Sequence, residues 1–395
     1  MSLLAWLGLL TGGVSPQELE SSATSRTCLE TLESLSEPKG GSLDQTDEED
    51  DRPVETAPSE WLPEGTETSD AQDPVRFNGV LMLQLDDGHR GNRNPAVQLP
   101  ALDGISNRPA STLPSIHRLR LSMTARLADN LDFIVQGHYD TRNDEANFRD
   151  CYLRWTINDA MVLQAGQFKM RFGYEGYRSA AETNTIERSD ATRALYQDRD
   201  FGLNLGGKAG KLEWDVGAFL GQRLEFQDED NGKDVSARLV YNFTDRMRMG
   251  LSAHRGTIVP EGASLGQPFI RADYEFHYHS GPWTIEAEAL YGDGYNFFSQ
   301  TDSLALGGYL ATVYRLDEQW DLVLHLDALD PDLNRVDLLS PDNATNARSR
   351  VVLGANYYLA RKPEHRIMVN YELNQQWQGP RFPQDGFRVR YQYRF

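Results

Sequence analysis

The sequence predicts an all-β protein, a 16-stranded antiparallel transmembrane β-barrel. The clearest observation is the last ten residues, GFRVRYQYRF, in which apolar and polar side chains alternate. A period of two residues is typical of a β-strand with one apolar and one polar face. Two further observations are the recurrence of such segments along the chain and the alternation of very short turns with long loops between them.

Alternating segments recur from Val75 to the C-terminus. Each is close to the roughly 9–11 residues that a tilted strand needs to cross a bilayer, and the number of segments is even, as in single-chain transmembrane barrels. The sixteen predicted strands are 75–85, 115–127, 131–140, 148–157, 161–170, 200–207, 211–220, 234–243, 246–255, 269–279, 283–292, 303–314, 320–329, 348–359, 366–375 and 386–395.

The connections between these strands fall into two classes. Short turns near 129–130, 158–159, 208–210, 244–245, 280–282, 317–318 and 360–364 alternate with longer loops at 86–114, 171–199, 221–233, 256–268, 330–347 and 376–385. Short turns on one rim and long loops on the other are typical of transmembrane barrels. Trp155, Trp214, Trp283 and Trp320 lie beside short turns, which predicts an aromatic girdle at the bilayer interface.

The composition separates an acidic N-terminal part from the predicted barrel. The chain has a net charge of −20, and residues 18–73 hold seventeen acidic residues against three basic ones. We interpret residues 1–17 as a clipped or mis-started signal peptide and 75–395 as the barrel. Residues 18–74 are interpreted as an acidic, disordered arm. The arm is either a solvated linker, which the composition favours, or a segment that contacts peptidoglycan or a partner.

Residues Phe148 to Gly207 carry a resemblance to a known family. The strings FRDCYLRW, AGQFKMRFG, IERSDATRAL and QDRDFGLNLGG follow one another there. This pattern resembles the phosphate-selective porin O/P family. The resemblance implies a trimeric outer-membrane porin whose third extracellular loop, Arg171 to Arg199 here, folds inward and narrows the pore. Phe395 resembles the C-terminal signal that the barrel-assembly machinery reads.

Strand alternation predicts which charged side chains face the pore. The basic wall is predicted to contain Arg76, Arg118, Arg120, Arg126, Arg348, Arg350, Arg366, Arg388, Arg390 and Arg394. The acidic wall is predicted to contain Asp273, Glu275, Glu286, Glu288, Asp321 and Asp327. Charged residues of the constriction are Arg171, Arg178, Glu187, Arg188, Arg193, Arg199 and Asp200. Either these groups select ions by the sign of their charge, or they only pair across strands and keep the lumen wet.

Signals for enzymatic chemistry are weak. His277 and His279 share one strand face near Glu286, but a third firmly placed metal ligand is missing, and a solvated pair is the better interpretation. Ser189 lacks the tight Gly-flanked turn of a hydrolase nucleophile, and phosphate-cradling Gly-rich motifs are absent. We therefore expect no enzyme, no cofactor, no metal site and no nucleic-acid partner.

The predicted function is passive diffusion of small hydrophilic solutes and ions through a water-filled channel in the outer membrane, with a bias toward anions. The expected partners are outer-membrane lipid and lipopolysaccharide, two further copies in a homotrimer, and small anionic or hydrophilic solutes, with both termini in the periplasm. Two alternatives remain. One is a phosphate- or oxyanion-selective porin, although lysine is scarce in the barrel, where Lys169 alone lies near the constriction. The other is a plugged structural barrel or a membrane-embedded enzyme.

Overall fold

The computed structural model describes residues 74–88, 113–141, 145–196, 198–221, 232–259, 266–296, 301–334, 346–376 and 385–395. The chain divides into two units, Met1–Ser59 and Glu60–Phe395, and all described residues belong to the second. The predicted signal peptide and almost all of the predicted acidic arm therefore lie outside the described residues.

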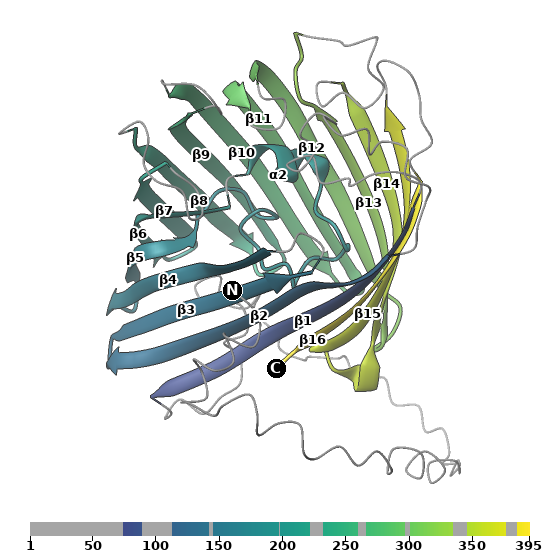
Figure 1. The fold of residues 1–395 in the computed structure, drawn as a ribbon, viewed down its shortest axis with the longest axis horizontal. Coiled ribbons are helices and arrows are strands. Elements are labelled where there is room, and N and C mark those ends of the chain that lie inside the picture. Colours follow the sequence, from purple (N-terminus) through teal and green to yellow (C-terminus); the bar gives the residue numbers. More distant parts are fainter. Residues whose placement is uncertain are drawn as a thin grey trace, which may run out of the picture. The chain divides into compact units, whose positions relative to one another are not determined.

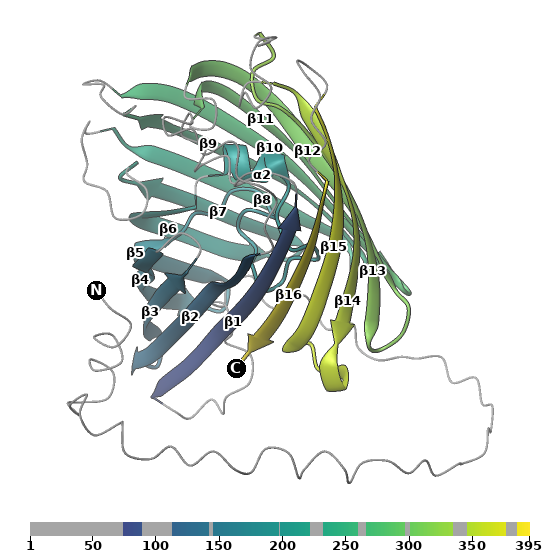
Figure 2. The same ribbon diagram turned by 45° about the vertical axis from the view of Figure 1, so that its right-hand side comes forward.

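Sixteen antiparallel strands of the described chain form one closed barrel, in which each strand pairs with its sequence neighbours and β1 pairs with β16 (Figures 1 and 2). The 16-stranded barrel is therefore confirmed, and every predicted strand is present. The strands are β1 (Val75–Gly88), β2 (Leu113–Ala128), β3 (Leu131–Asp140), β4 (Glu145–Asn158), β5 (Met161–Lys169), β6 (Arg199–Ala209), β7 (Leu212–Phe219), β8 (Asp234–Thr244), β9 (Met247–Ile258), β10 (Gln267–Ser280), β11 (Trp283–Asn296), β12 (Thr301–Arg315), β13 (Trp320–Asp330), β14 (Arg348–Tyr358), β15 (His365–Gln376) and β16 (Gly386–Arg394).

Side-chain burial alternates along the strands as the period of two requires. On β13, Leu322 and Leu324 are exposed on the outer face, whereas Asp321, Val323 and His325 between them are buried. Charged side chains inside and aliphatic ones outside suit a wet lumen and a lipid environment. No helix in the described residues is long and apolar enough to span a bilayer.

The barrel closes where β16 meets β1. The backbone of Phe395 exchanges two hydrogen bonds with that of Gly79, with N–O distances of 2.7 and 3.0 Å. A Cβ atom on Gly79 would lie 2.5 Å from the Phe395 ring, so glycine is needed for this close approach. The ring of Phe395, which is half exposed, therefore lies against the closing pair of strands.

The inner segment, residues 170–198 between β5 and β6, contacts strands on opposite sides of the barrel. Its short helix α2 (Asp190–Leu195) begins at Ser189, whose Oγ accepts a hydrogen bond from the Thr192 backbone N–H. Leu195 of this helix packs against Leu290 of β11, and Ala181 packs near Met82 of β1. In both views α2 lies within the ring of strands (Figures 1 and 2).

Arg199 and Asp200, both predicted to line the constriction, are the first residues of β6 and pair across the sheet with Lys169 and Phe168 of β5. Strand β6 thus begins one residue before its predicted start at Asp200, and Arg199 belongs to the strand and not to the loop.

Candidate pore lining

The acidic wall lies on the inner faces of β10, β11 and β13, and most of its carboxylates are neutralised by arginine. Arg238 of β8 contacts both oxygens of Glu275, with N–O distances of 3.1 and 2.9 Å. Arg178 of the inner segment lies 2.7 Å from Glu286. Asp321 pairs with Arg315 at 3.2 Å and accepts a hydrogen bond from the Tyr358 hydroxyl at 2.8 Å.

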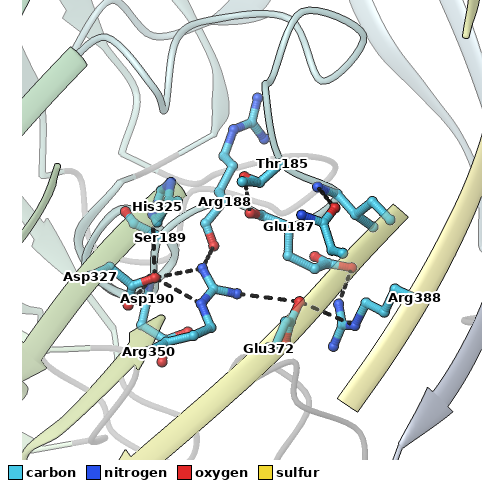
Figure 3. A network of polar contacts seen from close by, with 12 residues as sticks. Thr185, Glu187, Arg188, Ser189, Asp190, His325, Asp327, Arg350, Glu372 and Arg388 are labelled. Carbon is cyan, nitrogen blue, oxygen red and sulfur yellow. Dashed lines mark hydrogen bonds and ion pairs between the residues drawn. The ribbon is translucent and has the colours of Figure 1, made fainter. Parts of the chain in front are cut away.

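A buried network joins the acidic wall to the neighbouring strands (Figure 3). Arg350 of β14 lies opposite Asp327 of β13 and contacts its Oδ2 with Nε and Nη2, at 2.8 and 2.7 Å. Glu372 of β15 lies 3.9 Å from Arg350 and 3.4 Å from Arg388 of β16. Arg388 also contacts Glu187 of the inner segment at 2.8 Å. Positive and negative charges therefore alternate through this network.

Three arginines of the basic wall differ from these paired residues, and we call Arg118, Arg366 and Arg390 the arginine cluster. Arg390 is fully buried and directs Nε and Nη2 to the neutral amide oxygen of Gln84, at 3.0 and 2.6 Å, while its Nη1 has no hydrogen-bond partner among the described residues. Arg366 donates to the Ala181 and Thr183 carbonyls at 2.8 and 2.9 Å. These acceptors carry no net charge.

The register of the strands places the arginine cluster around the closing strand β1. Arg366 of β15 lies opposite Gln392 of β16, which lies opposite Met82 of β1, which in turn lies opposite Arg118 of β2. Gln84, one pleat further along β1, lies opposite Arg390. Arg118 forms no hydrogen bond or ion pair with the described residues. The cluster thus spans four adjacent strands.

The remaining basic residues have varied surroundings. Arg348 lies 3.1 Å from Asp190, Arg394 lies 4.0 Å from Glu182, and Arg126 lies 3.5 Å from Asp132 at an exposed rim position. Arg76 is half-buried, and Arg120 is buried opposite Val80.

The inner segment is fixed by charged groups at both ends. Arg171 pairs with Asp215 of β7 at 3.3 Å, and Arg149 of β4 pairs with Asp198 at 2.5 Å. Burial alone would raise the pKa of Asp198, but the guanidinium groups of Arg199 and Arg149 hold it well below its ordinary value. Asp198 is therefore ionised at neutral pH and retains its attraction to both arginines.

The charge of Arg178 is stabilised in the same way. Burial alone would lower the pKa of Arg178, but the carboxylate of Glu286 outweighs it, and the pKa lies above its ordinary value. Arg188 donates to the Glu175 and Arg178 carbonyls, at 2.7 and 2.5 Å, and Arg193 contacts Asp190 at 3.4 Å. The segment thus neutralises part of its own charge.

Sequence reasoning missed several buried partners of these residues. Arg238, Glu372 and Asp215 face inward, and Asp150 of β4 contacts Arg199 at 2.9 Å. The period of two would have placed each of them on the inner face. Their partners depend on register and on the path of the inner segment, which the pattern does not contain.

The two histidines considered as a metal pair, His277 and His279, have different surroundings in the structure. His277 is buried, with Nε2 3.8 Å from Glu275 Oε1. His279 is exposed near the strand end, and its Nδ1 lies 3.0 Å from the Thr284 hydroxyl.

Comparisons with known proteins agree with this architecture. Residues 97–264 match the family model described as phosphate-selective porin O and P, which confirms the resemblance. The outer membrane channel DcaP of Acinetobacter baumannii superimposes with a TM-score of 0.57 at 14% identity, covering 81% of this chain and 97% of that chain. The anion-selective porin from Comamonas acidovorans superimposes with a TM-score of 0.56 at 11% identity, covering 81% of this chain and 99% of that chain. A loop L8 deletion mutant of OmpT from Vibrio cholerae superimposes with a TM-score of 0.57 at 9% identity, with the same coverage of 81% and 99%. No curated protein matches the sequence.

Proposed function

We propose that this chain, an outer-membrane β-barrel of the phosphate-selective porin O and P family, is a passive channel for small hydrophilic solutes and ions that favours anions. The observation that supports the anion preference is an imbalance on the inner face. Carboxylates of the acidic wall are largely paired with arginine, whereas Arg390 and Arg366 donate to neutral oxygens. The wall around β1 therefore has an excess of positive charge.

Excess positive charge in a narrow lumen acts on permeating ions directly. The protein wall has a low dielectric constant and concentrates the potential, which raises the local concentration of anions. Guanidinium groups remain charged at any relevant pH and replace part of the hydration that an entering anion loses. A cation at the same place receives no such compensation.

In this proposal the inner segment narrows the channel and brings more charge to its centre. Its attachments to β7, β11 and β15, through Arg171–Asp215, Arg178–Glu286 and Arg366–Ala181, support a fixed constriction. The proposed assembly is a homotrimer in outer-membrane lipid and lipopolysaccharide, inserted by the barrel-assembly machinery and with both termini in the periplasm.

Planar-bilayer recording of purified protein tests the proposal. We expect stepwise conductance. In a KCl gradient, the zero-current potential should have the sign that shows chloride to be more permeant than potassium. The preference should shrink with salt because the Debye length falls from about 10 Å at 0.1 M to about 3 Å at 1 M. An absence of ion current would favour a plugged barrel, and a cation preference would contradict the proposed field.

A narrower function is favoured by the arginine cluster itself. A guanidinium group binds phosphate or carboxylate through two parallel hydrogen bonds, and Arg390 Nη1 has no hydrogen-bond partner among the described residues. Phosphate added during recording should then reduce the chloride current. The same concentration of added chloride, as a control, should not reduce it. Equal currents with and without phosphate would leave only a general anion preference.

A further inference from the structure

Three carboxylates of the acidic wall form a cluster whose charge arginine neutralises only in part. Asp273, Glu275 and Glu288 are all buried, and one oxygen from each can be chosen so that all three lie within 4.8 Å of one another. Glu275 and Glu288 are directly opposite on β10 and β11. Like charges in opposite positions of a sheet destabilise it unless another group compensates them.

Asp273 is the unusual member of this cluster. Its side chain is buried, yet neither carboxylate oxygen has a hydrogen-bond partner in the described residues. Burying an ionised carboxylate without a partner is strongly unfavourable. The other buried acids of the acidic wall each have an arginine or backbone N–H partner. Asp273 therefore lacks the hydrogen-bond donor that each of its neighbours has.

We propose that Asp273, Glu275 and Glu288 bind one hard divalent cation, such as Ca²⁺, beneath the start of the inner segment. Ca²⁺ takes oxygen ligands at about 2.3–2.6 Å, so two ligands on either side of one ion lie up to about 5 Å apart. Three carboxylate oxygens that lie within 4.8 Å of one another suit a shared ion. Carboxylate oxygens are also the ligands that Ca²⁺ and Mg²⁺ prefer.

The charge of the cluster matches a divalent cation. Arg238 offsets Glu275. Glu288 accepts hydrogen bonds from the Tyr174 and Glu175 backbone N–H groups, at 2.5 and 2.9 Å, which bring no net charge. Within the described residues neither Asp273 nor Glu288 forms an ion pair. Two negative charges thus remain, whereas a single shared proton would neutralise only one.

Two glycines let the carboxylates of the cluster lie close to the backbone, and one of them belongs to the inner segment. A Cβ atom on Gly173, whose φ is +66°, would lie 2.9 Å from Glu288 Oε1. A Cβ atom on Gly250 would lie 2.7 Å from Glu275 Cγ. The Gly173 backbone N–H donates to Ser252 Oγ at 3.1 Å, on the strand position opposite Asp273. A bound cation would hold residues 173–175 against β10 and β11.

The metal content of folded, full-length protein tests this inference independently of ion preference. Protein refolded in excess Ca²⁺ is passed through a desalting column, and only the heat-modifiable folded fraction is analysed by mass spectrometry for calcium. We expect one Ca²⁺ per chain. Asp273→Asn should retain at least about tenfold less, because affinity depends steeply on the number of charged ligands. This variant removes no hydrogen bond that the described residues supply.

Asp132→Asn is the matched control, since Asp132 is a buried acid of β3 already paired with Arg154 at 2.7 Å. It should retain one Ca²⁺ per chain. Ca²⁺ should also raise the thermal unfolding temperature of the wild type and of Asp132→Asn but not of Asp273→Asn. Absence of Ca²⁺ from the folded wild type, or equal retention by Asp273→Asn, would overturn the inference. The first result would indicate a shared proton, and the second an ion bound elsewhere.

Discussion

The acidic wall and the arginine cluster occupy different sectors of the same barrel. They differ in whether their charged side chains have oppositely charged partners. On β10, β11 and β13, carboxylates such as Asp327 and Glu286 receive an arginine from a neighbouring strand or from the inner segment. Around β1, Arg366 and Arg390 receive only neutral oxygens. The number of charged residues in a sector is therefore a poor guide to its field, because the field depends on which charges are already paired.

The largest effect, on assembly of the barrel itself, should follow from disrupting the pairing of β1 with β16, around which the arginine cluster lies. Deletion of Phe395 removes the backbone that pairs with Gly79 and the ring that packs on it, whereas Phe395→Asp removes the ring and places a charge there. We expect normal synthesis but no folded, heat-modifiable protein in the outer membrane. Phe387→Asp, on the outer face of the same strand but away from its end, serves as a control for the loss of one aromatic residue. Normal assembly of the Phe395 variant would contradict the assigned role.

Replacing an arginine that is paired with a carboxylate should lower the free energy of unfolding more than replacing one that donates only to neutral oxygens. Arg350→Met leaves Asp327 and Glu372 without their shared cation, and breaking such a buried pair costs about 3–5 kcal/mol. Arg390→Met leaves only the Gln84 amide oxygen without its donors, which costs about 1–3 kcal/mol at most. Free energies of unfolding in urea, measured on protein folded into lipid, compare the two variants. Equal losses would mean that Arg390 has a counter-charge too.

The strands were predictable because each one alternates between lipid and lumen, so a period of two recurs in every segment. The sixteen strands follow from this pattern, and the ends differ by a few residues, as on β12, where Thr301 precedes the predicted start at Ser303. The inward orientation of Asp273 and Arg390 follows from it as well.

The pairing of the charges was not predictable from the pattern. Asp327 meets Arg350 because β13 and β14 pair in one particular register. Arg178 meets Glu286 because the inner segment, 108 residues away in sequence, follows one particular path through the barrel. Neither register nor path leaves a periodic signal in the sequence. The division into walls was therefore visible, whereas the distinction between neutralised and excess charge was not.

The smallest effect is expected from the acidic N-terminal part. If its excess of fourteen negative charges entered the lumen, it would neutralise the arginine cluster and weaken the contrast between the two sectors. A self-repelling acidic segment gains little from ordering itself in a confined space. Deletion of residues 18–73 should therefore change neither single-channel conductance nor zero-current potential. A rise in either would indicate that this segment enters the pore.

We propose that the arginine cluster, and not the total charge of the barrel, sets the ion preference. Arg118→Gln, Arg366→Gln and Arg390→Gln together should then move the zero-current potential toward cation preference in a KCl gradient near 0.1 M, where the Debye length is about 10 Å. The control triple, Arg246→Gln, Arg361→Gln and Lys362→Gln, removes the same charge from exposed positions near the short turns. We expect a clear shift of the zero-current potential for the first triple and little for the second. Equal shifts, or none for the first, would contradict this proposal.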